Sequence, residues 1–126
     1  MRRADQRRAA VVALYQHDVT GRPLGELIPP HASAFTRELV DGVLGTQAEL
    51  DGLIERHARN WSLDRIAPLE RAILRVALYE MLHRADVPDE VAIDEAVEAA
   101  KELCAAEAAG FVNGILGAVK ETEVTQ

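Results

Sequence analysis

The sequence has little cysteine and few aromatic residues, and each shortage excludes a class of protein. Cys104 is the single cysteine, so an intramolecular disulfide and a cysteine-based zinc site are both excluded. Aromatic residues make up only 4% of the chain, which argues against an aromatic-rich β-barrel. Alanine, leucine, valine and glutamate are abundant instead, and this mixture favours helix over strand. We therefore expect an all-α protein in a reducing compartment.

Long hydrophobic runs are also missing. No stretch of about 18 uncharged apolar residues could cross a bilayer. The apolar residues that follow the first arginines are too few and too interrupted for a secretory signal. At 126 residues and 48% hydrophobic, the chain is long enough for one domain with a core and too short for two ordinary ones. These features predict a soluble, cytoplasmic protein with one domain over residues 1–126.

Hydrophobic periodicity and turn residues divide the chain into about six helices of a single bundle. The first helix is expected over residues 4–18, because the sequence TGRP follows it with a glycine and a proline. Ser33 can cap the next helical segment. That segment is either one long helix or two nearly collinear helices that meet at Gly42 and Gly45.

The segment WSLDRIAPLERAILRVALYEMLHR predicts the central helix of the bundle, because it leaves only a narrow polar side. Pro68 suits the first turn of this helix, and Ser62 can cap a short turn before it. Asp94 is expected to cap the following helix, which would run from Glu95. A last amphipathic helix contains Phe111 and ends in a polar tail.

Positive charge is concentrated at the N-terminus. The net charge is -7, yet the first ten residues carry +3 and the remainder -10. This basic segment, residues 1–10, contains five charged residues: Arg2, Arg3, Asp5, Arg7 and Arg8. Arg3 and Arg7 lie on the stripe that becomes apolar at Val11, so we expect the stripe to leave the core there and to present both guanidinium groups.

Helix stability does not account for these arginines, because exposed cations at a helix N-terminus cost about 0.3–1 kcal/mol each. Guanidinium groups match phosphate oxygens, so the basic segment indicates a local contact with nucleic acid. The alternative is a solvated and partly frayed terminus.

Two segments of the chain form a recognisable pair: RRADQRRAAVVALYQHDVTG at the start, and LERAILRVALYEMLHRADVPDEVAIDEAVEAAKEL, which FVNGIL follows. Together they resemble the NusB family of bacterial transcription antitermination factors. They lie in the family's order, and the resemblance covers essentially the whole chain. It implies a non-enzymatic adaptor, without cofactor or metal, that pairs with NusE, a small-subunit ribosomal protein. The pair is expected to bind a single-stranded boxA element in nascent RNA, notably ribosomal RNA leaders, and to make RNA polymerase resist termination within an antitermination complex.

The resemblance also implies site residues. Seven are expected to contact RNA: Arg2, Arg3, Arg7, Arg8, Tyr15, Phe111 and Asn113. Two are expected at the surface that binds NusE: Tyr15 and Glu70. Charged groups suit the backbone of single-stranded RNA, and rings or amides suit its splayed bases. From the residues alone, both rings could be core, Asn113 could be an ordinary exposed residue, and Glu70 could simply favour the first helical turn.

One stretch departs from the family pattern. Many members have a serine that caps the last helix and a lysine directly before the phenylalanine, whereas CAAEAAGF has Ala108 and Gly110 at those places. The loss of this cap and this cation is expected to leave the helix start frayed and to weaken RNA contact there.

Signals for catalysis are weak, so we do not expect an enzyme. Glu80 and His83 form one E-x-x-H pair, but a di-iron site needs a second copy, which the sequence lacks. No glycine-rich phosphate loop follows a strand. Arg71 and Arg75 are expected to form a solvated stripe rather than a second RNA site.

Two alternatives belong to other classes. NusB-like RNA-binding domains also stand at the front of some RNA cytosine methyltransferases, but 126 residues leave no room for the catalytic domain. The chain could instead be a purely protein-binding helical module, for example a homodimer, whose arginines are inert or covered by a partner. A dependence of RNA affinity on NusE and on salt would distinguish the adaptor from this module.

Overall fold

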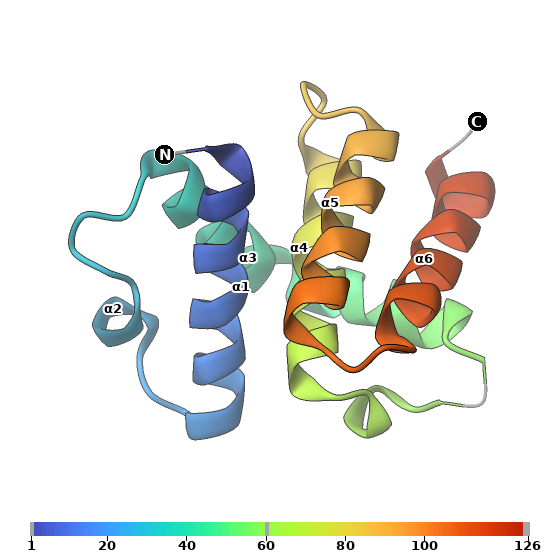
Figure 1. Cartoon of the computed structure of the whole chain (residues 1–126), viewed down its shortest axis with the longest axis horizontal. Helices are drawn as coiled ribbons and strands as arrows, with labels where there is room; N and C mark the ends of the chain where they lie inside the picture. Colours follow the sequence, from blue (N-terminus) through green and yellow to red (C-terminus); the bar gives the residue numbers. More distant parts are fainter. Residues whose placement is uncertain (1, 60, 125–126) are drawn as a thin grey trace.

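The computed structural model describes residues 2–59 and 61–124, and it is built from helices (Figure 1). Six α-helices follow one another: α1 (Arg3–Thr20), α2 (Leu24–Leu27), α3 (Ala34–His57), α4 (Pro68–His83), α5 (Asp89–Leu103) and α6 (Ala108–Val119). A 3-10 turn, η1 (Leu63–Arg65), precedes α4, and a π-helical turn, η2 (Lys120–Val124), follows α6. The described residues contain no strand, so the predicted all-α bundle is confirmed.

Helix α4 lies at the centre of the bundle. It packs against α1, α3 and α5, and more lightly against α6. Figure 1 shows α1 on one side of α4 and α6 on the other. Most α4 side chains are buried, among them Ile73, Leu74 and Leu78. A helix that is apolar on nearly every side needs neighbours all round, so the predicted central position is confirmed. None of the described helices is both long and apolar enough to span a membrane.

α1 begins one residue before the predicted range 4–18 and ends two residues after it, and α3 begins directly after Ser33 as predicted. α1 ends at Thr20, and its C-cap is Gly21, whose φ of 75° is left-handed and whose N–H donates to the carbonyl of His17. Ser33 caps α3 as predicted, since its Oγ accepts a hydrogen bond from the N–H of Thr36 at 3.0 Å. α3 then continues without a break, so one long helix is the correct alternative.

Gly42, in the middle of α3, marks a close approach between helices rather than a break. A Cβ atom at this position would overlap the ring of Tyr79 in α4. Gly45, nearly one turn later, meets nothing within 4 Å. The absence of a side chain at Gly42 therefore allows α3 and Tyr79 to pack together.

The start of α5 contradicts the prediction. α5 begins at Asp89 with Pro88 at its N-cap, so Asp94 lies exposed inside the helix and caps nothing. Pro88 fixes the backbone ahead of the helix, and Asp89 and Glu90 place carboxylates in the first turn, where the helix dipole favours them. These signals start the helix about one and a half turns before Asp94.

Two other expected caps behave differently. Ser62 precedes η1 as predicted, but its Oγ donates to the Asp64 carboxylate at 2.6 Å instead of accepting from the backbone. At α6 no side chain caps the helix start, as the loss of the serine predicts. The first turn is nevertheless helical, because Ala108 is buried and its N–H donates to the carbonyl of Ala105.

Candidate nucleic-acid interface

Arg2 and Arg3 present their side chains at the surface where α1 begins. Arg2 is 85% exposed and lies 3.6 Å from the Asp5 carboxylate, an ion pair that contributes little in water. The Arg3 guanidinium stacks over the ring of Phe35 at 3.9 Å from its centroid. Stacking leaves the edge of the guanidinium, with its N–H groups, available to an anion. Both residues therefore fit the predicted phosphate contacts.

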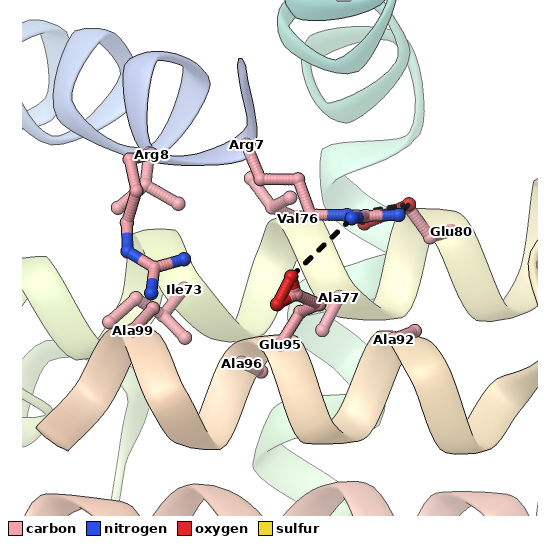
Figure 2. Close-up of a pocket in the computed structure, with 11 residues that line it drawn as sticks. Arg7, Arg8, Ile73, Val76, Ala77, Glu80, Ala92, Glu95, Ala96 and Ala99 are labelled. Carbon is pink, nitrogen blue, oxygen red and sulfur yellow. Dashed lines mark hydrogen bonds and ion pairs between the residues drawn. The ribbon is translucent and has the colours of Figure 1, made fainter. Parts of the chain in front are cut away.

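Arg7 is buried, unlike Arg2 and Arg3. Its Nε and Nη2 donate to both oxygens of the Glu80 carboxylate in α4 at 2.9–3.1 Å. Its Nη1 lies 3.7 Å from the Glu95 carboxylate of α5 (Figure 2). The expectation that Arg7 faces solvent is therefore wrong, because the buried Glu80 needs a cationic partner. Its RNA contact stays a prediction, which this geometry disfavours.

Arg8 lies between the two extremes. Its Nη2 donates to the Glu102 carboxylate of α5 at 3.4 Å, and its side chain reaches toward Ile73 and Ala99 (Figure 2). Its Nε and Nη1 are buried and have no hydrogen-bond acceptor among the described residues. Arg8 also lines a cavity of about 20 Å³, which it shares with Glu95. A phosphate would have to compete with Glu102 for this guanidinium.

The three other predicted RNA residues are Tyr15, Phe111 and Asn113. Tyr15 in α1 and Phe111 in α6 are partly buried and pack against the core, so neither side chain is fully covered. Asn113 is exposed, but it does not face the same way as Phe111, because residues two apart on a helix point in different directions. The structure does not bring Asn113 and Phe111 together.

Glu70 lines a cavity of about 310 Å³ between α4 and the start of α6. Trp61, Arg65, Glu107 and Phe111 line the same cavity. Burial raises the pKa of Glu70 above its usual value, and the charge of Glu107 raises this pKa further. Two carboxylates that repel one another here would gain from a cation supplied by a partner protein.

Arg71 and Arg75 are not the solvated stripe that the sequence predicts. Arg75 is buried, and its Nε and Nη2 donate to the Asp51 carboxylate of α3 at 2.7 and 3.1 Å. Arg71 donates to Asp18 of α1 at 2.9 Å and to two carbonyls of residues 63–66. The polar side of α4 faces acidic residues of its neighbours, so both arginines join helices instead of meeting water.

The E-x-x-H pair of α4 is divided between two partners. Arg7 holds the Glu80 carboxylate, whereas the His83 Nε2 lies 2.8 Å from the Glu49 carboxylate of α3. In the described ranges, 2–59 and 61–124, no group of three or more His, Cys, Asp or Glu side chains could hold a metal ion.

Trp61 is the surface residue that sequence reasoning missed. It is 50% exposed and lines two neighbouring cavities, both of which Phe111 also lines. The available signal was its position: the only tryptophan of the chain stands in the connection between α3 and α4, outside any helical apolar stripe, with Arg59 two residues before it.

Comparison with curated proteins identifies close relatives along nearly the whole chain. The transcription antitermination protein NusB of Bacillus velezensis is 44% identical over 126 residues, which cover 95% of this chain and 96% of that protein. The protein of the same name from Bacillus subtilis is also 44% identical and covers 95% of each chain. NusB of Frankia casuarinae is 49% identical over 92 residues, or 73% of this chain and 68% of its own.

Solved structures agree. T. maritima NusB has a TM-score of 0.89 and 32% identity, covering 98% of this chain and 94% of its own. The NusB chain of a crystal structure of antitermination factors NusB and NusE in complex with dsRNA has a TM-score of 0.82 and 28% identity, covering 96% and 98%. The NusB family pattern itself matches residues 4–121. The chain therefore belongs to the NusB family.

Proposed function

We propose that this chain is a transcription antitermination factor that acts together with a NusE-type ribosomal protein. The pair binds boxA-type single-stranded RNA in nascent transcripts, notably ribosomal RNA, and helps RNA polymerase to resist termination. The chain is an adaptor in the cytoplasm and not an enzyme. The observation that carries the proposal is its likeness, over 96% of its length, to a NusB chain that was crystallised with NusE and RNA.

The geometry supports separate surfaces for the two partners. Arg2 and Arg3 supply exposed guanidinium groups for RNA phosphates at the start of α1. Glu70 and Glu107 lie at the opposite end of the bundle, where α4 and α6 begin (Figure 1). A basic ribosomal protein would relieve the repulsion between these carboxylates, so we assign the cavity that they line to the partner.

Within the RNA surface we rank the predicted residues by their accessibility. Arg2 and Arg3 contact phosphates directly, and Arg8 does so after it exchanges Glu102 for a phosphate. The partly buried rings of Tyr15 and Phe111 stack against bases or meet the partner. Arg7 holds α1 in place through Glu80.

The test is fluorescence anisotropy of a labelled boxA-type RNA, titrated with this chain alone and with a NusE-type protein at several salt concentrations. We expect tight binding that needs the partner and falls with salt. The double variant Arg2→Ala/Arg3→Ala should weaken binding and make the log–log salt slope about 1.4 units shallower, since each phosphate contact contributes about 0.7.

Arg22→Ala is the matched control, because Arg22 is an exposed arginine just beyond the far end of α1, where it pairs with Glu26. This variant should bind RNA as the parent does. Binding that ignores both salt and the loss of Arg2 and Arg3, or a complex with NusE that ignores RNA, would overturn the proposal and favour a purely protein-binding module.

A further inference from the structure

Two cavities meet at Trp61 and Phe111, and their linings differ in charge. The first, of about 310 Å³, contains Glu70 and Glu107. The second, of about 330 Å³, shares Trp61 and Phe111 with the first, and no aspartate or glutamate lines it. The two rings therefore line both an acidic cavity and a cavity with basic side chains.

The second cavity offers an unused cation. Arg59 lines it, is exposed, and forms no hydrogen bond or ion pair with the described residues. His57 also lines it, but the His57 ring faces Glu123, with 3.3 Å between Nε2 and the carboxylate. Arg56 compensates that carboxylate as well, at 2.7 Å. Arg59 is thus the group in this cavity that an external anion would meet.

The same cavity has room for a flat ring. Its volume of about 330 Å³ falls in the range of small-molecule sites, about 300–1,000 Å³. Gly110 and Gly114 form part of its floor on α6, and a Cβ atom at either place would meet nothing within 4 Å. Trp61 exposes half of its surface at the edge. An exposed indole beside a guanidinium is the combination that holds a base and its phosphate in single-stranded RNA.

We propose that this cavity binds one nucleotide of single-stranded RNA, with the base stacked on Trp61 and the phosphate bound by Arg59. The inference rests on the proposed function and extends its RNA surface beyond Phe111, across α6 to the connection between α3 and α4. The absence of lining carboxylates favours RNA over a cationic peptide, and the aromatic lining favours a base over a simple anion.

The test uses Trp61 as its own reporter, since it is the only tryptophan. A complex of this chain with a NusE-type protein is titrated with boxA-type RNA, while anisotropy of the labelled RNA measures binding. Emission of an otherwise identical complex with Trp61→Phe is subtracted, which leaves the Trp61 signal alone. We expect RNA to quench Trp61 with the same midpoint as the anisotropy, and RNA trimmed by a few nucleotides at one end to bind without quenching.

Arg59→Gln should weaken the long RNA about 3–10-fold and leave the trimmed RNA unchanged. Arg22→Gln is the matched control, because Arg22 is an exposed arginine that pairs with Glu26 and lines neither cavity. Trp61→Ala should weaken binding of the long RNA, and Trp61→Phe should restore most of it, since a phenyl ring still stacks.

Four results would overturn the inference. In the first, anisotropy shows that RNA binds the parent and Arg59→Gln equally well, and Trp61 is not quenched. This result would exclude the nucleotide site and leave the proposed function intact. Equal losses of RNA affinity in Arg59→Gln and Arg22→Gln would show that only the net charge of the protein matters, and not this cavity. Quenching by a glutamate-rich peptide but not by RNA would assign the cavity to a protein ligand. Failure of any RNA to bind the complex would remove both proposals.

Discussion

Four arginines that look equivalent in the sequence occupy three kinds of environment. Arg2 and Arg3 are exposed, Arg7 is buried in a bidentate pair with Glu80, and Arg8 is partly covered beside Glu102. The sequence predicts the cluster of charge but not this division, because Glu80 lies 73 residues from Arg7 along the chain. A carboxylate inside an otherwise apolar helix was the local sign that a buried cation was needed.

At Arg7, replacement by methionine should destabilise the fold by about 3–5 kcal/mol, because Glu80 would remain buried without a partner. Arg3→Met, at the exposed position, should change the free energy of unfolding by less than about 0.5 kcal/mol. Urea unfolding followed by circular dichroism measures both. The double variant Arg7→Met/Glu80→Met should recover much of the loss. A stable Arg7→Met protein that has lost RNA binding would instead assign Arg7 to RNA.

Among the elements, the start of α1, the cap of α3 and the start of α4 could be predicted, because Ser33, Pro68 and apolar periodicity act locally. The start of α5 could not, because Asp94 and the pair Asp89–Glu90 are competing signals in one short segment. Pro88 decides between them. The continuity of α3 through two glycines also depends on tertiary packing, which periodicity alone does not contain.

Gly42 and Gly45 give a matched test of that packing. Gly42→Ala should destabilise the protein by about 1–3 kcal/mol, because a methyl group would overlap the Tyr79 ring and force that ring out of its packing position. Gly45→Ala meets open space in the same helix and should stabilise it by about 0.5–1 kcal/mol. Thermal unfolding compares the two variants. Equal effects of both substitutions would show that helix propensity, and not the contact with Tyr79, determines how they change the stability.

Across the whole molecule, the concentration of positive charge in residues 1–10 could be predicted by counting charged residues. The pairing of these arginines with carboxylates of other helices could not. Carboxylates of the acidic body reach the basic segment: Glu80 and Glu95 hold Arg7, and Glu102 holds Arg8. Less of the N-terminal charge is therefore free for RNA than the sequence indicates. The small number of free arginines fits a protein whose binding to RNA depends on a second, basic protein. The candidate partner surface at Glu70 was predictable only through the family, because neither its cavity nor Trp61 follows from periodicity.

Acidification should lower the stability of the whole fold. Four carboxyl groups have a pKa below the usual value of 3.8 for Asp or 4.5 for Glu, because each accepts a side-chain hydrogen bond. Asp64 accepts from Ser62, Asp86 from Arg84, Glu90 from Lys120 and Glu123 from Arg56. A lowered folded-state pKa stabilises the protein above the unfolded-state pKa, and this contribution is lost as the pH falls through the folded-state value. The temperature midpoint of unfolding should therefore decrease as the pH is lowered from about 5 to about 3, the range in which these carboxyl groups take up protons.

Glu70 should change the stability in the opposite direction when the pH is lowered in the same experiment. Its raised pKa, from burial and from Glu107, means that ionised Glu70 destabilises the fold and that acid relieves this effect. Glu70→Gln should be more stable than the parent at pH 7, and this advantage should disappear below the usual glutamate pKa. A midpoint that stays constant down to pH 3, or a Glu70→Gln variant with no advantage at pH 7, would contradict this assignment.

The pairing of Arg7 with Glu80 also constrains the order in which the molecule can mature. α1 leaves the ribosome before α4, so the buried guanidinium of Arg7 has no Glu80 counter-charge until residue 80 has been made, 73 residues later. At about 5–20 residues per second, that interval lasts roughly 4–15 s. During translation, α1 must wait for the centre of the bundle before it can dock. The surface proposed to hold nascent RNA is thus itself completed late in a nascent chain.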